Sequence, residues 1–258
     1  MTMLRVHRIA PTVLLGLVAC GGPATYGPVT PAPTSPMEVE ALHASARVSG
    51  LDDRRFDHST YWRSIEPYLG GPVSSRVVGE SAEGRDVRQL TFGSGPTTVL
   101  LWSQMHGNES TASMSLADMI RFFHESPDHP LARRIADGAT IHMIPMLNPD
   151  GAERFQRRNA QGIDVNRDAR RLQTPEGRVL KAVRDEVEPD FGFNLHDQGA
   201  AIRVGNSDRG VAIALLAPAF NEARDIDDKR RKAMQVASLL IEAMDPMVGD
   251  HIAKYDDT

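Results

Sequence analysis

Short apolar runs alternate with segments of helical periodicity from about residue 51 onward. The runs have the length of buried strands, and the segments between them repeat apolar residues every three to four positions, as amphipathic helices do. Proline marks segment ends, as at Ser126-Pro127 and Thr174-Pro175. The pattern predicts strands at 76–78, 86–91, 99–102, 141–146, 191–195, 202–204 and 211–216, and helices at 61–68, 112–123, 175–187 and 234–244.

This order of elements predicts the fold class. Buried apolar strands separated by helices favour an α/β fold, with a mixed, mostly parallel sheet and helices on both faces. In such folds, ligands collect at the carboxyl ends of the strands. His106, Asn148 and His196 each follow the end of a predicted strand. We therefore expect these three residues to meet at one edge of the sheet.

The pair His106 and Glu109 is a candidate half of a metal site. A catalytic zinc ion takes three protein ligands and keeps one position open, and two His with one Glu form an established set. His and Glu three residues apart also occur by chance in solvated loops. Here the pair lies in a turn directly after a strand, Gly107 permits a tight turn, and His196 closes another strand. The sequence therefore predicts zinc ligation by these two His and this Glu.

A second polar group lies in the loop 157–167. Arg157, Asn166 and Arg167 suit a carboxylate, because a guanidinium forks onto two oxygens and an amide adds a donor. A solvated basic loop is the alternative interpretation of the same residues. Upstream, Asn148-Pro149-Asp150-Gly151 is typical of a turn.

These segments together resemble the M14 family of zinc carboxypeptidases. His-x-x-Glu, then Asn-Pro-Asp-Gly, then Arg-x-Asn-Ala-x-Gly-Ile-Asp-x-Asn-Arg, then a strand ending in His occur here in the family's order, within about residues 72–200. The resemblance implies a zinc-dependent enzyme that hydrolyses C-terminal peptide bonds, with one zinc ion held by His106, Glu109 and His196. It also implies that Arg157 stabilises the oxyanion, and that Asn166 and Arg167 bind the free C-terminal carboxylate of a peptide substrate.

The sequence departs from the family pattern in three places. Asp168-Ala169-Arg170 and Asp197-Gln198 are unusual and look like a bacterial secreted subgroup. The family's general-base Glu lies many tens of residues beyond the second His, and the carboxylates available after His196 are Glu222 in a loop, Glu242 on a helix and several Asp. We therefore expect a C-terminal truncation. The alternatives are an inactive zinc- or peptide-binding module without the base, and a cell-wall peptide amidase of the same family.

The N-terminus predicts export and anchoring. Residues 1–19 resemble a lipoprotein signal peptide that ends before Cys20, which is the one cysteine of the chain and the expected lipidation site. A plain secretory signal is the alternative. Residues 20–50 are expected to be a tether rich in Pro, Gly and Thr, and 51–258 the peptidase domain. The predicted location is the bacterial cell envelope, lipid-anchored at the periplasmic face or the cell surface. The net charge of −5 argues against a nucleic-acid partner.

Overall fold

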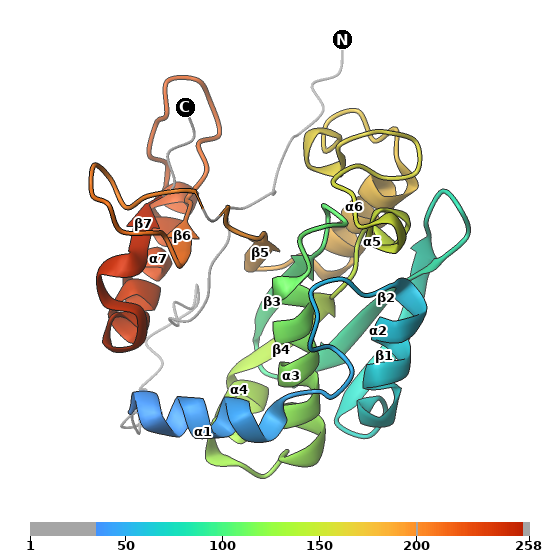
Figure 1. The fold of residues 1–258 in the computed structure, drawn as a ribbon, viewed down its shortest axis with the longest axis horizontal. Helices are drawn as coiled ribbons and strands as arrows, with labels where there is room; N and C mark the ends of the chain where they lie inside the picture. Colours follow the sequence, from blue (N-terminus) through green and yellow to red (C-terminus); the bar gives the residue numbers. More distant parts are fainter. Residues whose placement is uncertain (1–34, 200, 255–258) are drawn as a thin grey trace. The chain divides into compact units, whose positions relative to one another are not determined.

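The computed structural model describes residues 35–199 and 201–254, and these residues form two compact units (Figure 1). The large unit comprises Val39–Pro189 and Asn194–Asp197. The small unit comprises the described residues of Met1–Glu38, Asp190–Phe193 and Gln198–Thr258. The predicted peptidase domain, 51–258, contributes to both units, and its boundaries stay a prediction.

The main sheet has five strands in the order β1-β2-β4-β3-β5, and β1 to β4 lie in the large unit. β1 and β2 form an antiparallel hairpin, β2 pairs antiparallel with β4, and β3 pairs parallel with β4. The predicted mixed sheet is confirmed, although antiparallel pairing outweighs parallel pairing among β1 to β4 because the hairpin adds to one edge. The strands are β1 (Val73–Glu80), β2 (Asp86–Phe92), β3 (Thr97–Ser103), β4 (Ala139–Ile144) and β5 (Phe191–Leu195).

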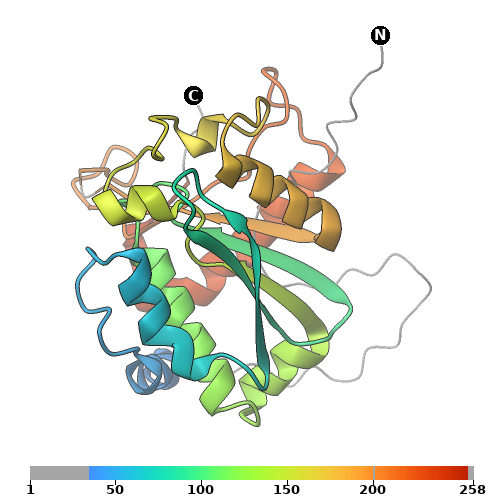
Figure 2. The same cartoon turned by 90° about the vertical axis from the view of Figure 1, so that its right-hand side faces the viewer.

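Helices cover both faces of this sheet, as predicted (Figure 2). On one face lie α2 (His58–Ile65) and α3 (Thr111–Glu125), where Phe123 stacks on Phe92 of β2 with ring centroids 3.9 Å apart. On the other face lies α6 (Pro175–Val187), which Thr174 caps by accepting a hydrogen bond from the N–H of Gly177.

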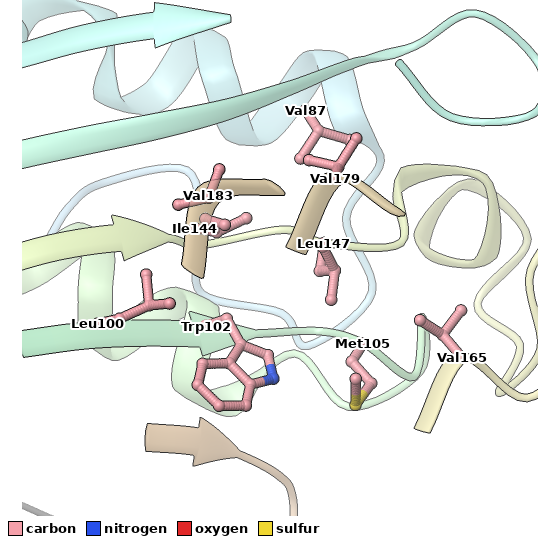
Figure 3. Packing of buried hydrophobic residues seen from close by; sticks show 9 residues of the cluster. All are labelled: Val87, Leu100, Trp102, Met105, Ile144, Leu147, Val165, Val179 and Val183. Atoms are coloured by element: carbon pink, nitrogen blue, oxygen red, sulfur yellow. The ribbon is translucent and has the colours of Figure 1, made fainter. Parts of the chain in front are cut away.

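One buried cluster joins α6 to the sheet and to the loops beyond the strand ends. Val179 and Val183 of α6 pack with side chains of β2, β3 and β4 (Figure 3). Met105 and Val165 extend this cluster beneath the loops that follow β3 and precede α6. Since each buried aliphatic side chain contributes about 1.5–3 kcal/mol, the loops that carry the predicted site rest on a firm core. The cluster consists of Val87, Leu100, Trp102, Met105, Ile144, Leu147, Val165, Val179 and Val183.

The remaining elements of the large unit are short. Asn148-Pro149-Asp150-Gly151, expected to be a turn, opens the helix α5 (Pro149–Arg154), and Asn148 is its N-cap. The sequence prediction missed this helix and α4 (Pro130–Gly138), because neither is long enough to show a clear helical period. Two 3₁₀ turns, η1 (Glu66–Tyr68) and η2 (Val165–Arg167), complete the set.

The small unit is built around one parallel strand pair. β6 (Ile213–Leu215) pairs with β7 (Ile252–Lys254), and the chain between them contains α7 (Asp228–Val248) and the 3₁₀ turn η3 (Gly249–His251). The strand predicted at 202–204 is absent from the described residues, where Arg203 forms one isolated bridge with Gly210.

Part of the predicted N-terminal organisation can be compared with the structure. Residues 1–19 and Cys20 lie outside the described residues. The predicted tether, 20–50, is described from residue 35, and there it contains the helix α1 (Pro36–Ala46) rather than an extended chain. None of the helices within the described ranges combines the length and apolar content that a bilayer span requires.

Candidate metal centre and substrate loop

The loop 104–110, here called the metal loop, follows β3 and is held in an unusual conformation. Gln104 is buried and has a positive φ of 51°, a left-handed conformation that is uncommon for residues other than glycine. Its side chain stabilises the turn, because Nε2 donates to the carbonyl of Gly107 (2.9 Å) and Oε1 accepts from the Ser113 hydroxyl (3.0 Å). The turn directs His106 and Glu109 to the same side.

A close backbone contact holds the other side of the metal loop. A Cβ on Gly107 would lie 1.9 Å from the backbone carbon of Gly151, so only glycine fits here, and the reason is space rather than a positive φ. Asn148 is fully buried beside this contact and donates through Nδ2 to the carbonyl of Met105 (3.2 Å). Asn148 therefore supports the metal loop from the strand-end edge and contributes no ligand atom to the cluster.

The three predicted ligands meet. Glu109 lies between the two imidazoles, with Oε1 2.8 Å from Nδ1 of His106 and Oε2 2.7 Å from Nδ1 of His196. All three ligand atoms lie within 4.8 Å of one another. His106 is buried, whereas His196 is partly exposed, so the cluster has one enclosed side and one side open to solvent.

Two further groups contact this cluster, and one of them was not expected. Asp164 lies 3.0 Å from Nε2 of His106, which leaves Nδ1 of that ring facing Glu109. Arg157 donates through Nη1 to Glu109 (3.2 Å) and through Nε to Asp164 (3.1 Å). A carboxylate on the outer nitrogen of a ligating imidazole fixes the tautomer and orientation of the ring.

The charges at the cluster are mutually stabilised. Burial raises the pKa of Glu109, but the hydrogen bonds from His106 and His196 outweigh burial and bring this pKa down to about 2. At Asp164, burial likewise raises the pKa, and the contacts with His106 and Arg157 lower it below its usual range. Both carboxylates are therefore ionised at neutral pH, as ligands or partners of a metal centre must be.

The predicted substrate residues take different positions. Asn166 bonds to its own loop and to β5, since its N–H donates to Asp164 (2.9 Å) and its side-chain oxygen accepts from Asn194 (3.3 Å). Arg167 is exposed and lines a pocket of about 460 Å³ together with Arg158 and Arg171. Among the described residues, the guanidinium groups of Arg167 and Arg171 have no hydrogen-bond or ion-pair partner.

The buried side-chain amide of Asn159 fixes the loop 157–167. Asn159 accepts hydrogen bonds from the N–H groups of Gln161 (3.1 Å) and Ile163 (3.0 Å), and its Nδ2 donates to Glu176 (2.9 Å). Asn159 and Glu176 are fully buried. The polar loop is thus fixed to the first turn of α6 rather than solvated freely, which disfavours the alternative interpretation of a solvated basic loop.

No general base is assigned within the described residues. The two carboxylates weighed from the sequence, Glu222 and Glu242, are exposed residues of the small unit. The expected truncation stays a prediction.

A match to a family of known proteins decides the family of this chain. A family model described as zinc carboxypeptidase, Peptidase_M14, matches residues 61–200, which is more than half of the chain. The chain belongs to the M14 zinc carboxypeptidase family. Carboxypeptidase 2 of Trichophyton rubrum is 27% identical over 131 residues, which cover 51% of this chain and 22% of that protein.

Solved structures agree with this family membership. A metallo-carboxypeptidase from Pseudomonas aeruginosa is 26% identical with a TM-score of 0.50, covering 55% of this chain and 40% of that one. Thrombin activatable fibrinolysis inhibitor, 12% identical, shares the fold with a TM-score of 0.57 over 84% of this chain and 65% of its own. The chain thus spans less than two thirds of the length of each of these three proteins.

Sequence reasoning missed residues that contact the cluster or hold its loop. Asp164 stands inside the 157–167 motif, and its place two residues before Asn166 was the available signal. Gln104 was missed although its side-chain partners, Gly107 and Ser113, lie only three and nine positions away, because nothing in a glutamine marks the buried turn that it holds.

Proposed function

We propose that this chain carries the metal centre and the substrate-binding loop of a zinc-dependent carboxypeptidase that hydrolyses C-terminal peptide bonds. One observation carries the proposal: in a member of the M14 family, His106, Glu109 and His196 converge, and Arg157 contacts the same carboxylate.

The donor set fits zinc. Two imidazole nitrogens and one carboxylate lie close enough for one ion, and two His with one Glu is a catalytic zinc set that leaves a position open. The orientation of His106 fits as well, because Asp164 occupies Nε2 and leaves Nδ1 as the ligand atom. When bound, zinc supplies a Lewis acid and lowers the pKa of a coordinated water.

Arg157 is placed to serve the reaction. Its guanidinium is held by Glu109 and Asp164 at one edge, and its side chain is 46% exposed. The remaining N–H groups are therefore available to a substrate carbonyl beside the cluster. We assign Arg157 as the donor that stabilises the negative charge developing on that oxygen.

Arg167 and Asn166 are assigned to the C-terminal carboxylate of the substrate. The pocket of Arg158, Arg167 and Arg171 is rich in guanidinium groups, and its two carboxylates, Asp164 and Asp168, are already committed to other partners. A carboxylate therefore finds unpaired cationic donors there. The Pseudomonas enzyme was solved with (2-guanidinoethylmercapto)succinic acid, which bears carboxylates and supports recognition of such groups in a relative.

Peptide binding tests this assignment independently of turnover. A peptide with a free C-terminal carboxylate should bind the zinc-loaded protein roughly 10–100 times more tightly than the same peptide with a C-terminal amide, the usual worth of a charge-assisted contact. Arg167→Gln should abolish the preference. Arg170→Gln is the matched control, because Arg170 is exposed and does not line the pocket. Equal affinities for both peptides would disprove the assignment.

Turnover separates an enzyme from a binding module. Release of single residues from the free C-terminus, stopped by a chelator, would establish a carboxypeptidase. Binding of zinc and peptide without release by this chain would favour the inactive module, in agreement with the expected lack of a base.

We also propose lipid anchoring at Cys20 in the cell envelope, supported by the apolar segment that ends at this cysteine. The protein expressed in a bacterial host should partition into detergent, and Cys20→Ser should partition into the aqueous phase. Equal partition of both forms would refute the anchor.

A further inference from the structure

One set of contacts next to the metal centre involves a segment that lies outside the family match. Residues 51–57 precede position 61, where the match begins, and pass beside the metal loop. Arg54 in this segment and Asp197, the residue after His196, form an ion pair although 143 positions separate them. Their side chains are 56% and 10% exposed, respectively.

Asp197 ties the end of β5 to the start of α3. Its Oδ1 accepts a hydrogen bond from the N–H of Thr111 (3.1 Å), and its Oδ2 accepts one from the Thr111 hydroxyl (3.1 Å). Its own N–H lies 3.4 Å from Oε2 of Glu109, the same oxygen that contacts His196. Thr111 follows the metal loop directly, so Asp197 connects the two chain segments that supply the ligands.

Arg54, in a third chain segment, contacts both Asp197 and the metal loop. Its Nη2 donates both to Asp197 and to the carbonyl of Asn108 in the metal loop, the latter at 3.4 Å. Its own carbonyl accepts a hydrogen bond from the hydroxyl of Ser110. Arg54 therefore contacts the metal loop on both sides of Glu109 as well as the residue beside His196.

The segment that carries Arg54 is itself well fixed. Leu51 and Phe56 are buried on either side of it, 4% and 6% exposed. Asp53 accepts from the N–H of Arg55 (2.8 Å), and Asp57 caps α2 through the N–H of Thr60. Arg54 therefore keeps its backbone position when the side chain is truncated, and a variant tests the side chain alone.

We propose that Arg54 and Asp197 are positioning residues that hold His196 against the metal loop and thereby preorganise the zinc site. The proposal rests on zinc as the metal of the proposed function, and it concerns metal affinity rather than turnover. Outer contacts that orient ligands typically change metal affinity 10–100-fold. Asp197 makes more of these contacts than Arg54, so its loss should have the larger effect.

Zinc affinity of the full chain, measured by competition with a chromophoric chelator, tests the pair. Asp197→Ala should weaken zinc binding by roughly 10–100-fold and Arg54→Ala by about tenfold. The double variant should lose less affinity than the two single effects combined, because the Asp197 substitution already breaks the ion pair and leaves Arg54 only its 3.4 Å contact with the carbonyl of Asn108. Arg54→Lys should restore most of the affinity, since one nitrogen makes both contacts of Arg54.

A nearby ion pair provides the control. Arg47→Ala removes the exposed pair with Asp52, 3.2 Å apart, which contacts no residue of the cluster, and should leave zinc affinity unchanged. Thermal unfolding of the metal-free variants is measured in parallel. If Asp197→Ala unfolds at a lower temperature than the parent, Asp197→Asn replaces it, because asparagine keeps an acceptor for Thr111 but loses the charge that pairs with Arg54. Zinc affinities of the Arg54 and Asp197 variants within twofold of the parent, or additive effects in the double variant, would overturn the proposal. Absence of zinc binding by the parent chain would instead count against the proposed function.

Discussion

The two units of this chain differ in how they use their apolar residues. In the large unit, apolar side chains of β2, β3 and β4 are buried beneath helices, and Ile65, Leu90, Met143 and Ile144 are fully buried. In the small unit, the apolar residues that the structure buries are few and mostly small, such as Ala217, Ala233 and Val236. Large apolar side chains there are exposed, including Phe220 at 60%, Met247 at 50% and Leu239 at 45%.

The difference explains where the site can be precise. A metal centre requires ligands held within a fraction of an ångström, which needs packing and hydrogen bonds around them. The large unit provides both, since Met105 fixes the metal loop in the buried cluster, Asn148 hydrogen-bonds to that loop, and the bond from Asn159 to Glu176 fixes the loop 157–167. All residues assigned here to metal and substrate lie in this unit.

The two units should differ most in how much stability is lost when one apolar side chain is truncated to alanine. Ile144→Ala in β4 should lower the free energy of unfolding by about 2–5 kcal/mol, because the side chain is fully buried. Leu239→Ala in α7 removes an exposed side chain and should change the free energy by about 0.5 kcal/mol or less. Urea unfolding monitored by tryptophan fluorescence is suitable, since Trp62 and Trp102 both lie in the large unit. Equal shifts of this transition by both variants would contradict the contrast.

Metal binding should depend on the large unit alone. The parent protein should bind about one equivalent of zinc. His196→Ala removes a ligand and should weaken binding by more than roughly 100-fold, beyond the effect of an outer contact. His251→Ala is the matched control, because His251 lies in the small unit and contacts the carbonyl of Gly210. Elemental analysis and chelator competition measure both, and retention of full affinity by His196→Ala would refute the ligand set.

Two buried carboxyls near the first turn of α6 should respond oppositely to pH. At Asp168, burial raises the pKa, but the hydrogen bonds from Thr174 and Gln173 lower it below the usual value. Its stabilising effect is therefore present above pH of about 4 and is lost as the pH falls through the lowered pKa. At Glu176, burial raises the pKa, so the charged form opposes folding once the pH rises above the usual Glu value.

The corresponding variants should therefore diverge at neutral pH. At pH 7, Asp168→Asn should destabilise the large unit by about 1–3 kcal/mol, because a charged acceptor of three hydrogen bonds is weakened. Glu176→Gln should be neutral or stabilising at pH 7, since it removes a buried charge and keeps an acceptor for Asn159. Urea titrations at pH 7 and pH 4 measure the difference in free energy of unfolding between the two variants, and this difference should be smaller at pH 4. A larger difference at pH 4 would show that the directions assigned to the two pKa shifts are wrong.

The smallest free energy is expected for local unfolding within the small unit. Residues 201–226 contain one three-residue strand and few buried side chains, so their opening should cost little free energy. Limited trypsin digestion should cleave there, at Arg203 or Arg209, before it cleaves at Arg88 in β2. Mass spectrometry identifies the first cut, and early cleavage within β1 to β4 would contradict the comparison.

The sequence by itself determined the elements and the chemistry of the large unit. Apolar periodicity located β3, β4, α3 and α6, and Thr174-Pro175 marked the start of α6. The motif spacing placed His106, Glu109 and His196 at strand ends, where the structure brings them together. These predictions succeeded because periodicity and spacing are local properties that a chain carries before it folds.

Only the tertiary structure decided which side chains meet across long separations. Asp164 contacts His106 over 58 positions and Arg54 contacts Asp197 over 143, and the partner of each residue follows only from the folded chain. Likewise Asn148 begins a helix rather than a simple turn, because its buried side chain bonds both α5 and the metal loop. The strand expected at 202–204 failed for the converse reason, since a short apolar run becomes a strand only where a neighbouring strand pairs with it.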